Sequence, residues 1–360
     1  MTLQAALLRH FDRHARDLPW RAETDPYRIW VSEVMLQQTR VDTVIPYYRR
    51  WLEQFPDVDR LATADLDEVL LAWQGLGYYR RARNLHAGAG VVRERHCGRV
   101  PDSYEALRAL PGVGEYTAGA VASIAFGEAV PAVDGNVKRV LARLYDEPSP
   151  AAAWLRRTAG ELVDGERPGD WNQALMELGA TVCTPTSPRC DACPVAEWCE
   201  ARAAGTQAER PAASRKKEVQ ARVFVVAVVV DAVGRALVVR RPEHGLLAGM
   251  WAFPDAPLEE DDDRVTAATE AVVAGAQDAT TGGLEGVSVR VGPGAWPRDL
   301  PAVRHRFTHL DATYQPVLLA GEGSDAENRR WIPLAEPWPV ALPVAQQKIA
   351  RSAAAALDDT

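Results

Sequence analysis

The hydrophobic positions of this chain follow two different periods. Across residues 1–205, apolar side chains recur every three or four positions, which is the period of helices that bury one face. The stretches with this period are Leu3–Phe11, Ile29–Leu36, Ala64–Leu71, Ala118–Ala125 and Leu155–Leu162. Prolines separate several of them, as expected where helices end. The first part of the chain is therefore predicted to be an all-α domain.

The period changes after residues 206–219, a small, polar and charged stretch with a proline that is typical of a linker. Val223–Val230 is a β-branched run of strand length, and Ala236–Arg240 follows it after a turn that contains glycine. We expect two further strands in Phe307–Leu319, on either side of Asp311–Ala312. Residues 220–356 are therefore predicted to form an α+β domain.

The charge distribution leaves nucleic-acid binding open. The formal net charge is −8, but residues 218–360 carry most of it. The earlier residues are nearly balanced and contain local basic groups, which are Arg49–Arg50, Arg80–Arg81–Arg83 and Arg93–Arg95–Arg99. DNA contact requires a basic patch rather than a basic protein, although such groups are also common on solvated helix faces.

Four cysteines, spaced C-x6-C-x2-C-x5-C, are concentrated in residues 183–199: Cys183, Cys190, Cys193 and Cys199. Four thiolates in one loop match an iron–sulfur cluster or a closed zinc site. A cluster is favoured, because zinc modules more often carry two C-x2-C pairs. Disulfides are disfavoured, since no leader segment or membrane span is recognised, and a reducing, cytoplasmic location is expected. Cys97 is expected to remain a reduced thiol.

Two turns and one acid in an apolar stretch are candidate functional features. Gly112-Val113-Gly114 lies between two helical stretches, where backbone N–H groups and a helix N-terminus could bind phosphate, or could form only a turn. Asp134 precedes Gly135 and an apolar helix, so it is either a helix cap or a functional carboxylate. Glu33 lies in a strongly apolar stretch. Its pKa is expected to be raised if it is buried, unless it is an ordinary helix-start glutamate.

In order and spacing, LPGVGEYTA from Leu110, VDGNV from Val133 and the four-cysteine loop resemble the helix-hairpin-helix superfamily of base-excision DNA glycosylases. The loop is similar to that of its endonuclease III branch, which implies a [4Fe–4S] cluster. SEVMLQQT from Ser32, QGLGYY from Gln74 and MELG from Met176 resemble adenine DNA glycosylases of the MutY type.

The resemblance implies roles for four catalytic residues. Glu33 would be the general acid that protonates adenine N7, and Asp134 would be the anion that stabilises the sugar cation. Asn136 and Tyr116 would hold these two groups in place. Tyr116 stands where strand-cleaving relatives carry a lysine, so base removal without efficient β-elimination is predicted, with no amine at the site to intercept the sugar.

The resemblance also implies contacts with DNA whose target base has been flipped out of the duplex. Gln37 and Tyr78 would wedge into the base stack, while Gln38, Thr39 and Leu76 would touch the opposing base. Gly112, Val113 and Gly114 would bind the DNA backbone.

GLLAGMWAFP from Gly245, FTH from Phe307 and WIP from Trp331 make residues 220–356 similar to the Nudix-like domain of the same family. The resemblance implies that Thr308 and His309 lie in a loop that recognises 8-oxoguanine. Ala267–Gly275, where a Nudix hydrolase carries its magnesium-binding acids, keeps only Glu270, so hydrolysis is not expected.

The sequence thus predicts a monomeric enzyme that excises adenine opposite 8-oxoguanine or guanine in double-stranded DNA. Two alternatives remain at this stage. One is an endonuclease III-like glycosylase/lyase for oxidised pyrimidines, and the other is a noncatalytic mismatch-binding protein.

Overall fold

The computed structural model describes residues 1–213, 219–274, 287–290 and 297–358. Contacts within the chain define two compact units. Unit 1 comprises Met1–Asp65 and Arg81–Arg215, and unit 2 comprises Leu66–Arg80 and Lys216–Thr360. The segment Leu66–Arg80 therefore packs with unit 2, although the chain enters it from unit 1 and returns to unit 1 afterwards. Residues 214–218 of the predicted linker lie outside the described part of the chain.

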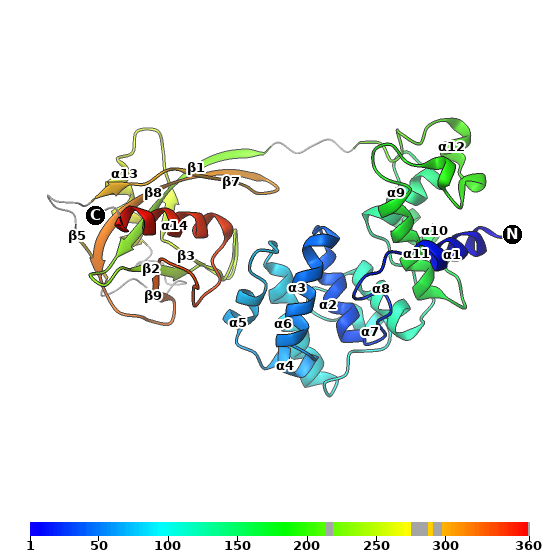
Figure 1. Cartoon of the computed structure of the whole chain (residues 1–360), viewed down its shortest axis with the longest axis horizontal. Helices are drawn as coiled ribbons and strands as arrows, with labels where there is room; N and C mark the ends of the chain where they lie inside the picture. The colour runs from blue at the N-terminus through cyan, green and yellow to red at the C-terminus, as the bar shows by residue number, and fades with distance from the viewer. Residues whose placement is uncertain (214–218, 275–286, 291–296, 359–360) are drawn as a thin grey trace. The chain divides into compact units, whose positions relative to one another are not determined.

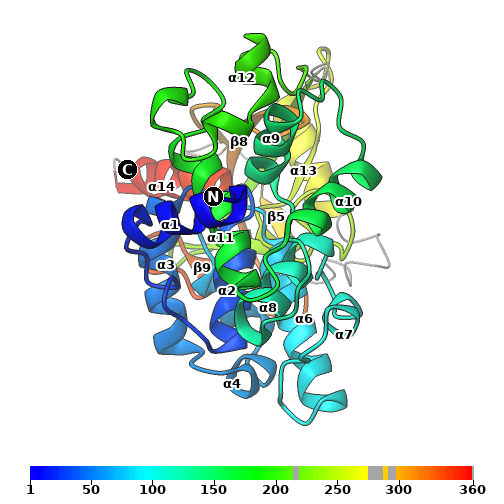
Figure 2. The same cartoon turned by 90° about the vertical axis from the view of Figure 1, so that its right-hand side faces the viewer.

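Unit 1 is helical (Figures 1 and 2). Its α-helices are α1 (Leu3–His14), α2 (Pro26–Leu36), α3 (Val41–Gln54), α4 (Val58–Ala62), α6 (Arg80–Arg95), α7 (Tyr104–Arg108), α8 (Glu115–Phe126), α9 (Gly135–Leu144), α10 (Ala152–Leu162), α11 (Pro168–Thr181) and α12 (Glu200–Ala204). Two short 3₁₀ turns, η1 (Cys190–Ala192) and η2 (Ala196–Trp198), lie in the cysteine loop.

Local chemistry explains where the central helices begin and end. Asp25 caps α2 and Pro26 occupies its first turn, where a missing N–H costs nothing. The Asp134 side chain accepts a hydrogen bond from the Val137 N–H and so caps α9. Helix α8 ends at Gly127, whose φ of 69° suits glycine.

The apolar faces of α1, α9, α10 and α11 form one core of unit 1. Helix α1 lies against α11 in both views (Figures 1 and 2). Three of the loop cysteines, Cys183, Cys193 and Cys199, pack on the edge of this core. The same helices therefore support both Asp134, at the start of α9, and the cysteine loop.

Unit 2 is built around one mixed sheet, with α5 (Leu66–Ala72) contributed by the segment that precedes α6. The remaining elements of its described residues are β1 (Gln220–Val230), β2 (Arg235–Arg240), β3 (Trp251–Ala252), β4 (Asp255–Pro257), α13 (Arg264–Ala274), β5 (Ser288–Arg290), β6 (Arg298–Asp299), β7 (Val303–Arg306), β8 (Leu310–Glu322), β9 (Arg329–Pro333) and α14 (Val344–Asp358).

The centre of the sheet is a parallel pair, β1 and β8, in which Gln220 lies opposite Leu310 and Val230 opposite Ala320. The prediction of a break at Asp311–Ala312 is wrong, because both residues lie inside β8. The turn falls earlier, at residues 307–309, where the Phe307 N–H donates to the Leu310 carbonyl over 2.7 Å. The pattern misled because Asp311 interrupts the hydrophobic run. In the strand its side chain pairs with Arg304 of the neighbouring β7.

Helices cover both faces of this sheet (Figure 1). Alternate residues of β1 point to opposite faces, so Val226 and Val228 pack toward α14, whereas Val225 and Val229 pack toward α13. An all-α unit and a unit of sheet plus helices confirm the predicted fold class. None of the helices described is long and apolar enough to cross a membrane.

Two helical glycines provide a matched test of packing in unit 1. A Cβ on Gly119 of α8 would lie 2.2 Å from the Pro131 carbonyl oxygen, whereas the nearest atom to a Cβ on Gly160 of α10 is 4.0 Å away. Gly119→Ala should lower the free energy of unfolding by about 1–3 kcal/mol through overpacking. Gly160→Ala should leave it unchanged or raise it by up to about 1 kcal/mol. Urea unfolding measures both, and equal effects would contradict the packing described.

Candidate active site and iron–sulfur loop

Glu33 is a buried acid on α2, with 5% of its surface exposed. Since α2 begins at Pro26, Glu33 is not a helix-start residue, and the alternative of simple stabilisation by the helix dipole is excluded. Burial raises the pKa of Glu33 to about 7, and the nearby charge of Asp134 acts in the same direction. At neutral pH a substantial fraction of this side chain is therefore a neutral carboxylic acid.

Tyr116, in the first turn of α8, donates a short hydrogen bond from its phenol to the Glu33 carboxyl. Burial and the two neighbouring carboxyls raise the pKa of Tyr116 well above its usual value, so the phenol remains a donor. The same hydroxyl lies 3.3 Å from the Met176 sulfur on α11. The Tyr116 hydroxyl, which lies between α8 and α11, therefore holds one carboxyl oxygen of Glu33 in place.

Asp134 has the opposite environment, because both of its oxygens accept hydrogen bonds. The Val137 N–H donates to Oδ1 and the Asn136 side-chain amide donates to Oδ2, each over 2.7 Å. Burial raises the pKa of Asp134 above its usual value, and these two donors limit the rise. Donors to both oxygens favour the ionised form. The cap reading and the functional reading are thus compatible, since Asp134 caps α9 and also faces the cavity.

Asn136 is held from behind by α11 and Arg139. A Cβ on Gly179 would lie 2.6 Å from the Asn136 Cβ, so only glycine permits this approach of α11 to α9. The Arg139 guanidinium donates to the Asn136 amide oxygen over 2.9 Å and to the Cys183 carbonyl over 2.9 Å. Arg139 therefore connects Asn136, which holds Asp134, to the cysteine loop.

One cavity of about 1080 Å³ brings the predicted catalytic residues together. Its wall includes Glu33, Tyr116, Asp134 and Asn136. It also includes Lys138, on α9 one turn after Asp134, which the sequence analysis did not single out. The cavity wall thus contains an amine, and the expectation that no amine intercepts the sugar stays a prediction. The side chain of Lys138 is exposed, whereas lysines that form Schiff bases are activated by desolvation or by a neighbouring cation.

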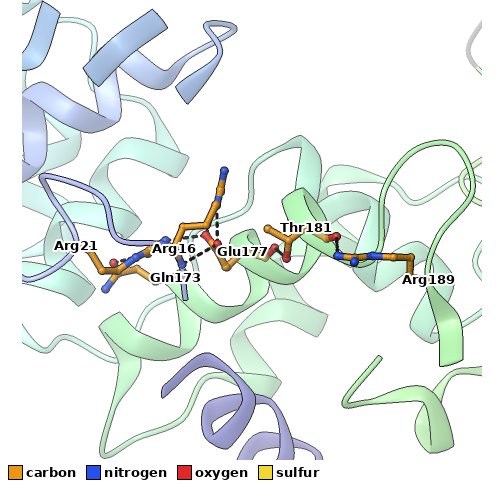
Figure 3. A network of polar contacts seen from close by, with 6 residues as sticks. All are labelled: Arg16, Arg21, Gln173, Glu177, Thr181 and Arg189. Carbon is orange, nitrogen blue, oxygen red and sulfur yellow. Dashed lines mark hydrogen bonds and ion pairs between the residues drawn. The ribbon is translucent and has the colours of Figure 1, made fainter. Parts of the chain in front are cut away.

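Besides Glu33 and Asp134, the cavity wall contains the buried carboxylate of Glu177, which the sequence marks only as part of the MELG motif (Figure 3). Arg16 and Arg21 donate to it from the loop after α1, at 2.6 and 2.7 Å. These guanidinium groups outweigh burial and lower the pKa of Glu177. Arg21 also donates to the Gln173 amide oxygen over 2.8 Å. No local pattern marks Arg16 or Arg21, because they lie far from α11 in the sequence.

Arg81 is another residue whose role the sequence does not reveal. It was grouped with the basic residues of α6, but it is buried, with 8% of its surface exposed. Its guanidinium donates to the carbonyls of Val34, Met35 and Gln37 over 2.7–2.9 Å and to the Thr39 hydroxyl over 3.1 Å. A cation at the C-terminus of α2 satisfies carbonyls that the helix leaves unpaired.

The turn that Arg81 holds contains three of the predicted DNA-contacting residues. Gln37 donates from its amide to the Thr117 hydroxyl over 3.1 Å, and Gln38 adopts a φ of 57°. Gln37, Gln38 and Thr39 all line the cavity. The predicted backbone-binding turn is also present, with Gly112 at a φ of 72°, Val113 buried, and Gly114 starting α8 without a side-chain cap.

The remaining predicted recognition residues lie in unit 2. Leu76 is buried, with 5% of its surface exposed, so a contact of this residue with DNA would come from its backbone. Tyr78 is 49% exposed and has a φ of 49°. Thr308 and His309 are exposed in the turn before β8, and the hydroxyls of Thr308 and Tyr78 lie 3.3 Å apart.

The cysteine loop presents four thiols and a supporting cation. Arg143, a buried residue of α9, donates to the Cys183 sulfur over 3.3 Å and to the Thr184 carbonyl over 2.7 Å. Burial, together with the other three cysteines, raises the pKa of Cys193 to about 11. Four thiols around a cation-supported, partly buried loop are the donor set of a [4Fe–4S] cluster.

Family models match three parts of the chain. Residues 31–163 match the HhH-GPD superfamily of base excision DNA repair proteins, residues 225–352 match the NUDIX domain, and residues 183–199 match the iron–sulfur binding domain of endonuclease III. These matches confirm the resemblance seen in the sequence. The third match spans all four cysteines of the loop and fits a [4Fe–4S] cluster there.

Whole-chain relatives extend this result. The adenine DNA glycosylase of Homo sapiens is 38% identical, over 97% of this chain and 73% of that protein. The adenine DNA glycosylase of Mus musculus is 37% identical, over 96% of this chain and 76% of that protein. A solved structure of a thermostable thymine-DNA glycosylase, 30% identical, superimposes with a TM-score of 0.53 and covers 56% of this chain and 95% of that one. The chain therefore belongs to the adenine DNA glycosylase family of HhH-GPD base excision repair proteins.

Proposed function

We propose that this enzyme hydrolyses the N-glycosidic bond of adenine in duplex DNA where adenine stands opposite 8-oxoguanine or guanine. One observation carries the proposal: a raised-pKa Glu33 and a doubly hydrogen-bonded Asp134 line the same cavity. Two carboxyl groups with different protonation states are what cleavage of a glycosidic bond requires. The names of the whole-chain relatives supply adenine as the base.

In this reaction Glu33 is the acid. Its proton passes to adenine N7, so the bond between N9 and C1′ of the sugar breaks with a neutral leaving base. Asp134 is the anion that stabilises the positive charge developing on the sugar, and Asn136 holds its second oxygen. Water then adds to C1′ and returns a proton to the carboxyl pair. The iron–sulfur cluster supplies no step of this chemistry, and its thiolate ligands organise the Cys183–Cys199 loop.

Recognition of the opposing base is assigned to residues around two turns. Gln38 and Thr39 on the turn held by Arg81, and Thr308 and His309 before β8, are the proposed contacts. The NUDIX-like unit serves as a binding module, since α13 offers only Glu270 where a hydrolase needs several acids. A monomer in the cytoplasm, bound to the nucleoid when it engages DNA, completes the proposal, because cluster thiolates require a reducing compartment.

Replacing Glu33 by glutamine tests the acid directly. Glu33→Gln keeps the shape of the side chain but cannot supply the proton, so single-turnover excision from an A:8-oxoguanine duplex should fall by about 10²- to 10⁴-fold. Binding to the same duplex should be retained. Glu161→Gln, the same change at an exposed position of α10, is the control and should have no effect. A Glu33→Gln enzyme of normal rate would refute the assignment.

The pH dependence of excision follows from the raised pKa of Glu33. The reactive form is the protonated one, so the single-turnover rate should decline as pH rises through about 7. Well above this point the decline should approach about tenfold per pH unit. The rate should be measured between pH 5 and 9 with enzyme in excess over duplex. A rate that stays constant from pH 6 to 9 would contradict the proposed proton donor.

Position 116 is a tyrosine and not a lysine, which predicts little strand cleavage. With A:8-oxoguanine duplex, breaks should appear only after alkali treatment, and borohydride should trap at most a small fraction of protein on DNA. Any minor adduct should come from Lys138 and disappear in Lys138→Gln. An abundant adduct that forms at the rate of base release would instead favour the alternative glycosylase/lyase reading.

A further inference from the structure

The segment Leu66–Arg80 makes polar contacts with the sheet and loops of unit 2 at its start, middle and end. At its start, the Asp67 carboxylate pairs with Arg240 and Arg330 and accepts a hydrogen bond from the Trp251 indole N–H over 3.1 Å. In its middle, the Gln74 side-chain oxygen accepts the Leu342 N–H over 2.9 Å. At its end, the Tyr78 hydroxyl lies 3.3 Å from the Thr308 hydroxyl.

The contacts of Asp67 form a built pocket rather than a surface ion pair. The Asp67 side chain is only 12% exposed, and Trp251 is buried. The guanidinium groups of Arg240 and Arg330 lie over the Trp251 ring, with their carbons 5.2 and 4.7 Å from its centre. The three sheet residues come from β2, β9 and β3, so Asp67 joins three strands.

The charge of Asp67 is what makes this arrangement stable. Two cations contact one aromatic ring, and the carboxylate that pairs with both offsets their mutual repulsion. Only the carboxylate of this network is well buried, since the side chains of Arg240 and Arg330 are 26% and 41% exposed. Removing that carboxylate leaves both guanidinium groups without compensation, which costs more than losing a fully exposed pair. Asp67→Asn would keep the size of the side chain and an acceptor for Trp251 while leaving the two cations unneutralised.

Hydrogen bonds within the segment stiffen the turn between Asp67 and Tyr78, so a displacement of α5 would also move Tyr78. The Trp73 indole donates to the Gly77 carbonyl over 3.1 Å, and the Gly75 N–H donates to the Tyr79 hydroxyl over 3.3 Å. Gly75, Gly77 and Tyr78 all have positive φ, and a tyrosine holds such a backbone only when its surroundings enforce it.

We propose that Asp67 is a positioning residue for recognition of the base opposite adenine. Clamped by Arg240, Arg330 and Trp251, it fixes the segment Leu66–Arg80 on the sheet and thereby sets Tyr78 against Thr308. This role rests on the proposed function, because it concerns the preference for 8-oxoguanine over guanine. Asp67 touches neither the cavity of Glu33 nor the base itself.

The test compares two charge-removing variants of unit 2. Asp67→Asn removes the clamp, and Glu322→Gln removes an exposed ion pair with Arg290 near the end of β8. Single-turnover rates on A:8-oxoguanine and A:G duplexes give the preference ratio of each enzyme. Hydrogen–deuterium exchange of the free proteins reports the backbone, particularly the Leu342 amide that Gln74 holds and the turn from Phe307 to Leu310.

Asp67→Asn should lower the preference ratio by about fivefold or more. It should also speed exchange at Leu342 and in the turn at residues 307–310, without speeding exchange in the centre of β8. Thr308→Ala should lower the ratio to a similar extent, and combining it with Asp67→Asn should cause little further loss, because both act on one contact. Glu322→Gln should change neither readout.

Two results would overturn the inference: an Asp67→Asn enzyme with the wild-type preference ratio, or one whose exchange at Leu342 and residues 307–310 is unchanged. Losses that simply add in the double variant would also overturn it, since Asp67 would then act apart from Thr308. Failure of the proposed function looks different, because the wild-type enzyme itself would then release no adenine from either duplex.

Discussion

The structure of unit 1 depends on the burial of one carboxyl group among helices. Glu33 is buried on α2, where the residues beside it in the sequence are mostly apolar. A charged carboxylate would be strongly disfavoured there, and the single hydrogen bond from Tyr116 is too little to keep it ionised. The fold therefore favours the protonated form of Glu33 at the wall of a cavity that is large enough for a nucleoside. The same burial that costs stability creates the acid.

The second carboxyl shows how the fold creates the opposite state at the same cavity. Asp134 stands at the start of α9, where a backbone N–H and the Asn136 amide each bind one of its oxygens. Asn136 depends in turn on the close approach of Gly179 and on Arg139. Since Arg139 also binds the Cys183 carbonyl, the iron–sulfur loop and the anion share one scaffold. Loss of the cluster would then disturb Asp134 without the cluster taking part in the reaction.

Residues in short motifs were largely predictable from sequence, because their function and their local backbone coincide. Asp134 is both a helix cap and a cavity residue, and Gly112 is a glycine because its φ is positive. The long-range partners were not predictable. Arg21 reaches Glu177 across more than a hundred positions, and buried Arg81 looked like part of a solvated basic group. Their roles follow from how helices pack, which no local spacing records.

The strand prediction at Asp311 failed for a related reason. Its polarity predicted a turn, but in the sheet that side chain is paired with Arg304 on the neighbouring strand. The packing of Leu66–Arg80 with unit 2 could not be predicted from the sequence either, since the segment has ordinary helical periodicity. What decided it was Asp67, whose partners lie in three different strands.

The protonation state of Glu33 in the free enzyme is the most direct test of this account. A carbon-13 NMR titration of the glutamate carboxyls, with the Glu33 signal identified by its loss in Glu33→Gln, measures that state without any DNA or reaction. The account predicts a midpoint near pH 7. A midpoint near 4.5, the value of an ordinary glutamate, would show that Glu33 is ionised at neutral pH and could not be the proposed acid.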